Sequence, residues 1–208
     1  VKLLAPILPS KIIGIGKNYA DHAAEMKSEL PVEPLMFLKP STAVIGPGEV
    51  ITLPNQSSMV HHEAELAVVI GRFCKDVPRD RVSEVILGFT CANDVSARDV
   101  QESDGQWSRA KGFDTFCPLG PWIETDLDPS DLAVTTYVGD DLRQSGNTKN
   151  MIFSAVDLVS FVSHQMTLLP GDVILTGTPA GVGPIVSGDE VEVAIEGIGS
   201  LVNTVQRA

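Results

Sequence analysis

The sequence predicts an α+β domain that is mostly β, built around a rolled, mixed sheet with few short helices. Short runs of β-branched and apolar residues outnumber helical patterns, and no regular strand–helix–strand repeat is present. The 208 residues also include 18 Gly and 14 Pro without a periodic repeat, which is typical of a chain rich in strands and turns. This length fits one domain with one sizeable core.

Strand patterns and turn residues alternate along most of the chain. The run AELAVVIG at 64–71 is too continuously apolar to alternate, which indicates a strand buried on both faces. Glycine and proline separate the other runs. Strands are expected, in order, at 11–16, on both sides of a turn within 34–54, at 64–71, near 121–125 and 133–138, at 171–179, and as a hairpin around Gly197–Gly199 within 188–206.

Helical patterns are fewer. The clearest one begins with Ser154 and Asp157, which are spaced as in a capping box. Helices are expected at 18–29, 80–89 and 154–165. Residues 105–121 resemble a long loop, and 139–148 carries a Gly-Asp-Asp turn.

Composition limits the partners. The formal net charge of −12 argues against nucleic acid and anionic membranes. No apolar run reaches the roughly 18 residues of a membrane-spanning helix. Cys74, Cys91 and Cys117 are an odd number without CxxC spacing, which predicts a reducing, cytoplasmic location.

Three carboxylates stand at the ends of apolar runs. Glu63 and Glu65 would face the same side of a strand, and burying two like charges requires a cation to offset them. Asp94 follows another apolar run, and no lysine lies nearby in sequence. Three such oxygen ligands suit Mg²⁺, with Mn²⁺ as a substitute. A solvent-facing stripe and a Zn²⁺ site using His61 and His62 are the alternatives.

Two further segments carry polar groups that could take part in catalysis or binding. His22 and Glu25 are three apart on the helix expected at 18–29, where the carboxylate could orient the imidazole for proton transfer. On spacing alone, a coincidence on an exposed helix is the favoured interpretation. We expect the segment between Gly16 and Pro31 to be a weakly anchored lid. The turn TGTPAGVGP could present Thr178 and backbone N–H groups to an anion.

Seven motifs, taken in order, resemble the fumarylacetoacetate hydrolase family. The resemblance runs from about residue 11 to residue 205. The motifs are GIGKNYADHAAEM, PLMFLKPSTAVIGPG, HHEAELAVVIG, GFTCANDVSARDVQ, RAKGFDTFCPLGPW, GDVILTGTPAGVG and GDEVEVAIEGIGSL.

The resemblance implies a fold, an assembly and a site. The fold is the mixed β-sandwich roll of the family's C-terminal domain, usually a homodimer. Residues 1–10 would be a lead-in, and 11–208 a single catalytic domain. The metal would be held by Glu63, Glu65 and Asp94, the catalytic group would be His22, Glu25 and Lys111, and Arg98, Gln101 and Thr178 would contact the substrate.

The same resemblance implies a small anionic 2-oxo acid as substrate. Hydrolysis of the C3–C4 bond of an acylpyruvate, such as fumarylpyruvate or acetylpyruvate, is the first expectation. Oxaloacetate decarboxylation is the second, and isomerisation of 2-hydroxyhepta-2,4-diene-1,7-dioate in aromatic-acid catabolism is the third. A non-catalytic family member is the competing class.

Overall fold

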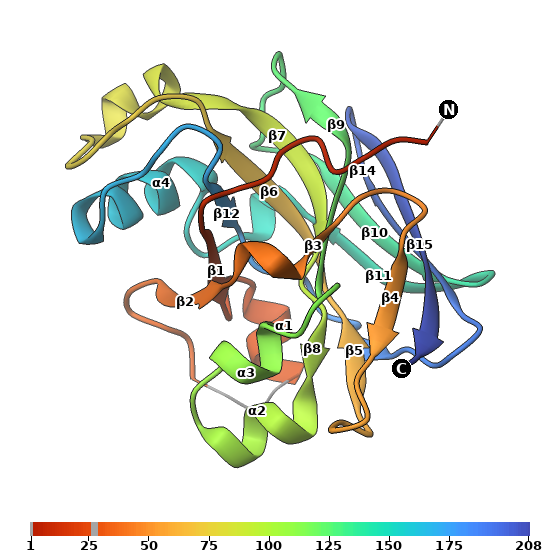
Figure 1. The fold of residues 1–208 in the computed structure, drawn as a ribbon. Helices are drawn as coiled ribbons and strands as arrows, with labels where there is room; N and C mark the ends of the chain where they lie inside the picture. Colours follow the sequence, from red (N-terminus) through yellow and green to blue (C-terminus); the bar gives the residue numbers. More distant parts are fainter. Residues whose placement is uncertain (1, 26–28) are drawn as a thin grey trace.

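The computed structural model describes residues 2–25 and 29–208, whose strands form three sheets (Figure 1). The largest sheet is mixed, with β1 and β12 parallel, β3 and β9 parallel, and the remaining neighbours antiparallel. Its seven strands are, in spatial order, β2 (Leu35–Lys39), β1 (Ile12–Gly16), β12 (Val173–Leu175), β6 (Ala64–Ile70), β7 (Ile86–Asn93), β9 (Cys117–Glu124) and β3 (Val44–Ile45).

The second sheet has five strands and is also mixed, since β15 and β4 run parallel. In spatial order they are β11 (Asp141–Asn147), β10 (Ala133–Val138), β14 (Glu190–Ile195), β15 (Gly199–Arg207) and β4 (Val50–Leu53). A small third sheet consists of β13 (Gly183–Pro184), β5 (Val60–His62) and β8 (Ser96–Ala97). The predicted mostly-β architecture around rolled, mixed sheets is confirmed.

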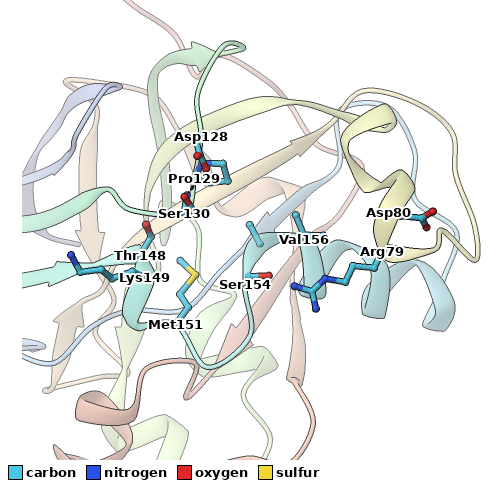
Figure 2. Close-up of a pocket in the computed structure, with 11 residues that line it drawn as sticks. Arg79, Asp80, Asp128, Pro129, Ser130, Thr148, Lys149, Met151, Ser154 and Val156 are labelled. Carbon is cyan, nitrogen blue, oxygen red and sulfur yellow. Dashed lines mark hydrogen bonds between the residues drawn. The ribbon is translucent and has the colours of Figure 1, made fainter.

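The helices are short, as predicted. They are α1 (Ala20–Glu25), α2 (Arg98–Asp104), α3 (Ser108–Lys111) and α4 (Ala155–Gln165), with 3₁₀ turns at η1 (Ser41–Ala43), η2 (Arg79–Glu84) and η3 (Thr148–Asn150). Figure 1 shows α1, α2 and α3 grouped at the lower end of the molecule, with α4 away from them on the left. The predicted capping box of α4 is confirmed: Asp157 N–H donates to Ser154 Oγ, and Ser154 N–H donates to the Asp157 carboxylate. A cavity of about 790 Å³ lies beside this helix start (Figure 2).

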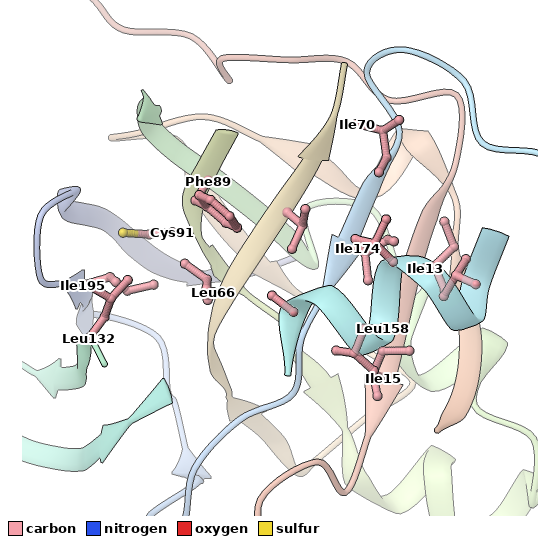
Figure 3. Close-up of a cluster of buried hydrophobic side chains, with 14 of the residues drawn as sticks. Ile13, Ile15, Leu66, Ile70, Phe89, Cys91, Leu132, Leu158, Ile174 and Ile195 are labelled. Carbon is pink, nitrogen blue, oxygen red and sulfur yellow. The ribbon is translucent and has the colours of Figure 1, made fainter. Parts of the chain in front are cut away.

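One apolar cluster packs the two large sheets and α4 together. The continuous run of β6 is buried at every residue, as predicted for a strand covered on both faces. Figure 3 shows side chains from β6, β7, α4 and β14 in this cluster, among them Leu66, Phe89, Leu158 and Ile195.

The helix predicted at 80–89 is wrong. Residues Arg79–Glu84 form a 3₁₀ turn, and β7 begins at Ile86. The chain from Phe89 onward is buried between β6 and β9, so its apolar residues need no helical period. The helical spacing of the apolar residues from Val82 to Phe89 was therefore coincidental.

Two other expectations need correction. The loop expected at 105–121 contains α3 and the start of β9. The turn at Gly139 leads into β11, an edge strand that the polar sequence of 139–148 did not reveal. Exposed edge strands need no apolar pattern, which explains the omission. The helix expected at 18–29 is present as α1, and its last part at 26–28 lies outside the described residues.

The lead-in 2–10 runs along the domain surface and is attached to it. Ser10 Oγ donates to Asp172 at 2.6 Å, and Ile7 packs against a buried cluster. Within the described ranges, no helix is long and apolar enough to cross a membrane.

Candidate active site

The pairing of β6 with β7 brings three carboxylates together. Glu65, near the start of β6, lies opposite Ala92, and β7 ends one residue before Asp94. Asp94 N–H donates to the Glu63 carbonyl at 2.8 Å. Oxygens of the three acids lie within 4.8 Å of one another, and all three residues are buried. The sequence-predicted metal ligands therefore meet in space.

The local backbone differs from the expected strand. Glu63 lies in the junction between β5 and β6 rather than in a strand. Its N–H donates to the side chain of Asn93 at 2.9 Å, which holds the junction against the end of β7. The two glutamates thus lie where the chain passes from the small sheet into the large one, and not within one strand with a period of two.

Protein cations surround two of the three acids. Lys111 Nζ donates to Glu63 at 2.7 Å and to Asp94 at 2.5 Å. Arg98 forms an ion pair with Glu63. Cationic side chains that lie far away in sequence but close in space therefore supply part of the offsetting charge at these two acids.

Lys39 is the cation that sequence analysis missed. Its buried ammonium donates to Asp94 Oδ1 at 2.6 Å and to the Phe116 carbonyl at 2.8 Å. Lys39 ends strand β2, and a lysine that closes an apolar run of strand residues is the only signal in the sequence. Nothing in that signal links it to Asp94, 55 positions away.

Glu65 has no cationic partner within hydrogen-bonding distance among the described residues. Its carboxylate accepts from Gly177 N–H at 2.6 Å. Burial raises the pKa of Glu65 well above its ordinary value, and the neighbouring Asp94 and Glu63 raise it further. An acid in this condition is stabilised by a further cation, and three clustered carboxylates are the oxygen donors that Mg²⁺ and Mn²⁺ prefer. The residues present fit such an ion.

The neighbouring charges shift the other groups in opposite directions. Burial by itself would raise the pKa of Glu63, but Arg98 and Lys111 hold it below its ordinary value. Burial would lower the pKa of Lys111, yet Asp94 and Glu63 raise it overall, so this lysine stays charged. Glu63 and Lys111 are therefore held as a charged pair, whereas burial favours the neutral form of Glu65.

Helix α1 places the predicted dyad at this cluster. His22 Nδ1 lies 3.1 Å from Glu25 Oε2, and the imidazole is buried. Gly181 N–H donates to Glu25 at 3.1 Å, which connects α1 to the TGTPAGVGP turn. Tyr19 and Ala23 are also buried, so the first part of the segment expected as a lid packs against the domain, and its residues 26–28 lie outside the described residues.

One small pocket collects the predicted site residues. Its lining includes aromatic and charged groups from five parts of the chain. The predicted residues in it are His22, Glu63, Glu65, Asp94, Arg98, Gln101, Lys111 and Thr178, and the unpredicted ones include Lys17, Phe37 and Trp107. Glu25 reaches this pocket through its contact with His22.

The cavity in Figure 2 is much larger than this pocket, which holds about 40 Å³. The two cationic side chains at the larger cavity are paired near the surface, however: Arg79 with Asp157 at 2.6 Å and Lys149 with Asp131 at 3.0 Å. Buried, interacting titratable groups indicate chemistry better than volume does. We therefore place the candidate site at the carboxylate cluster.

The Zn²⁺ alternative finds no support in the described residues. Neither His61 nor His62 belongs to the group of ligand atoms that lie close enough to share an ion, and His62 Nδ1 lies 3.0 Å from Gln144 Oε1. His61 accepts a long contact of 3.4 Å from Arg98. Burial, followed by Arg98, lowers the pKa of His61 to about 4.

Known proteins resemble this chain over nearly its whole length. The solved structure of 5-carboxymethyl-2-hydroxymuconate delta-isomerase from Mycobacterium smegmatis is 60% identical, with a TM-score of 0.94 over 100% of this chain and 82% of that one. The mitochondrial oxaloacetate tautomerase Fahd2a of Rattus norvegicus is 45% identical over 217 residues, covering 99% of this chain and 69% of that protein.

A third relative was solved with a metal. Maleylpyruvate hydrolase from Sphingobium sp. SYK-6, in complex with manganese (II) ion and pyruvate, is 38% identical with a TM-score of 0.86, over 99% of this chain and 74% of that one. Residues 11–206 match the family described as fumarylacetoacetate (FAA) hydrolase C-terminal. The sequence match and the shared fold show that this chain belongs to that family.

Proposed function

We propose that this protein is a divalent-metal-dependent enzyme that moves a proton on small 2-oxo carboxylic acids. The observation that carries the proposal is the 3.1 Å contact between His22 and Glu25 at a pocket lined by three buried carboxylates. With Nδ1 held by Glu25, the other ring nitrogen is left to exchange a proton with a pocket ligand.

Glu63, Glu65 and Asp94 would hold the ion, Mg²⁺ or Mn²⁺. When bound, a divalent ion supplies a Lewis acid that stabilises negative charge on the 2-oxo oxygen. Together with such an ion, Lys111 and Arg98 beside the acids would make the pocket locally cationic in an otherwise acidic protein. This arrangement favours an anionic substrate.

Three reactions share the transfer of a proton to or from a carbon of the substrate. Tautomerisation of a 2-enol moves one proton between the 2-oxygen and C3, and isomerisation of a 2-hydroxy-2,4-diene moves one proton from the 2-oxygen to C5. Hydrolysis of an acylpyruvate adds hydroxide to C4 and a proton to C3 as the C3–C4 bond breaks. Decarboxylation releases C4 as CO₂ and also protonates C3. In each case the imidazole of His22 is the group in position to carry the proton.

Sequence identity to relatives of named activity gives an order to these reactions. The isomerase and the tautomerase are more similar to this chain than the maleylpyruvate hydrolase is. We therefore place isomerisation or tautomerisation first, ahead of the acylpyruvate hydrolysis that the sequence favoured, and decarboxylation third. The His22–Glu25 pair keeps hydrolysis as the second candidate, since the same pair could deprotonate water.

Steady-state rates on a substrate panel test the proposal. The panel is enol-oxaloacetate, followed as loss of the enol; acetylpyruvate and fumarylpyruvate, followed as pyruvate; and oxaloacetate, followed as CO₂, each with Mg²⁺ or Mn²⁺. We expect the fastest turnover on enol-oxaloacetate. Folded protein that turned over none of these substrates with either ion would contradict the proposal and favour a non-catalytic family member.

We further propose a cytoplasmic homodimer whose catalytic domain is 11–208. Its three cysteines are free and buried, which supports a reducing compartment. Leu35 and Leu38 on edge strand β2 are exposed in the single chain, where a second chain could cover them. Stable dimers typically bury over about 2,000 Å² in total. Sedimentation that found only monomer at micromolar concentration would contradict the dimer.

A further inference from the structure

Gln144 connects the core of the protein to the candidate site, although nothing in the sequence marked it. It is the one fully buried residue of edge strand β11, whose other residues are exposed or half-buried. The pairing of β10 and β11 shifts register next to it, between Thr136 and Tyr137. Such a bulge re-aims side chains, and here the amide lies beneath the TGTPAGVGP turn.

The backbone fixes which end of the Gln144 amide carries oxygen. Ala64 N–H can only donate, and it lies 3.0 Å from Oε1. The Pro179 carbonyl can only accept, and it lies 2.8 Å from Nε2. Oε1 also accepts from Thr136 Oγ1 at 2.8 Å and faces Nδ1 of His62 at 3.0 Å. The amide orientation is therefore determined at both ends.

This orientation decides the polarity of Thr178. Gln144 Nε2 donates to Thr178 Oγ1 at 2.7 Å, so the threonine oxygen acts as acceptor in that bond. Among the described residues, none accepts the hydroxyl hydrogen of Thr178, whose side chain lines the pocket with Glu65 and Lys111. The hydrogen is thus left for a ligand.

We propose that Gln144 is a positioning residue that keeps the Thr178 hydroxyl as a hydrogen-bond donor toward the pocket. The ligand group at this point must then be an acceptor oxygen, which in a 2-oxo acid is a carboxylate or oxo oxygen. A ligand with an ammonium group there, which has no acceptor, would set a second donor against the hydroxyl. The inference rests on the proposed function for the nature of the ligand, but not for the hydrogen-bond network itself.

The same turn also touches the metal ligand and the dyad. Gly177 N–H holds Glu65, and Gly181 N–H holds Glu25. A merely structural role of Gln144 would therefore disturb metal binding as well as ligand binding. This difference separates a positioning role from general support of the turn.

Binding of oxalate, a two-carboxylate probe with acceptor oxygens only, tests the proposal. Titration calorimetry in saturating Mn²⁺ would compare the wild type with T178V, T178S, Q144M and the double variant Q144M/T178V. We expect T178V and Q144M each to weaken oxalate binding about 10-fold or more, as for loss of a charged hydrogen bond. T178S should bind like the wild type, and the double variant no more weakly than T178V.

Mn²⁺ affinity without oxalate, measured by electron paramagnetic resonance, is the second readout. It should be unchanged in T178V and Q144M. Additive losses in the double variant, full oxalate binding by T178V, or weaker Mn²⁺ binding by Q144M would each overturn the inference. If Q144M did not fold, Q144E would replace it, since its ionised carboxylate keeps the acceptor side and removes the donor to Thr178.

The two proposals fail in different ways. Wild-type protein that bound Mn²⁺ but no oxalate, and turned over no 2-oxo acid, would overturn the proposed function together with this inference. Wild-type protein that bound oxalate while the variants followed the contrary pattern would overturn this inference alone.

Discussion

The two ends of strand β6 are equally buried but are stabilised differently. Toward Ile70, the side chains pack against α4, β7 and β12 in a dry apolar cluster (Figure 3). At the other end of the strand, the side chain of Glu65 belongs to a cluster of acids and cations. The apolar end tolerates neighbours of similar volume, whereas each charged group at the other end depends on specific partners.

This contrast teaches where function and stability should separate. Losing an apolar contact changes the free energy of unfolding and leaves the chemistry alone. Losing a charged group at the other end changes ion binding, catalysis, or both. The following variants test this separation, in order of expected effect.

Replacing Glu65 should have the largest effect. Glu65→Ala removes one of the three acids that would hold the ion, so turnover should be abolished. Metal affinity should fall by more than the about 10- to 100-fold that is typical when a residue that only contacts a ligand is replaced. Calorimetric titration with Mn²⁺ and steady-state rates measure both. Chelation of the wild type by EDTA should mimic the variant, and Mg²⁺ should restore only the wild type. Activity of Glu65→Ala near the wild-type level would contradict the metal site.

His22→Ala comes next. We expect kcat to fall by about 10²- to 10⁴-fold, the usual contribution of a general acid or base, with metal affinity unchanged because His22 is not among the three acids. Glu25→Gln, which loses the charge but keeps the size, should give a smaller fall. If His22→Ala stayed fully active while Glu65→Ala did not, the dyad would be a coincidence and metal-driven decarboxylation would be favoured.

Lys39→Met tests the missed cation. Breaking a buried ion pair typically costs about 3–5 kcal/mol, and Asp94 would keep only Lys111. Chemical denaturation in EDTA should show this loss. Because a bound cation can replace the missing charge, Mg²⁺ should raise the melting temperature of Lys39→Met more than that of the wild type. An equal rise in both proteins would show that Lys39 and the ion site are uncoupled.

Leu158→Ala belongs to the apolar region. This fully buried residue of α4 packs in the core cluster, and its truncation should lower the free energy of unfolding by about 2–5 kcal/mol. At a temperature where the variant is folded, kcat and metal affinity should match the wild type. A change in either would show that the two regions are coupled through β6.

The smallest effect concerns pH. The pKa of Glu65 is raised above its ordinary value of 4.5, so the folded protein keeps a proton that the unfolded chain releases. This contribution to stability is complete below pH 4.5 and is lost as the pH rises through the raised pKa. In EDTA, the melting temperature of Glu65→Gln should therefore exceed that of the wild type by a margin that grows above pH 4.5. A constant margin would contradict it.

Much of the apolar framework could be predicted from the sequence. The run at 64–71, the capping box at Ser154 and the hairpin around Gly197–Gly199 each depend on neighbours in the chain, and all three are confirmed. In 80–89, where a 3₁₀ turn leads directly into β7, the apolar residues of the two elements together mimicked a helical period, and prediction failed. An edge strand such as β11, with one buried residue, also gave no signal.

The sequence by itself determined the three acids and the His22–Glu25 spacing, because strand ends and helical turns are local. Only the tertiary structure decided what stabilises them. Lys39, Lys111 and Gln144 reach the cluster and its turn from distant strands and helices. Charge and hydrogen-bond partners act through space over a few ångströms, and that distance is set by sheet pairing rather than by position along the chain.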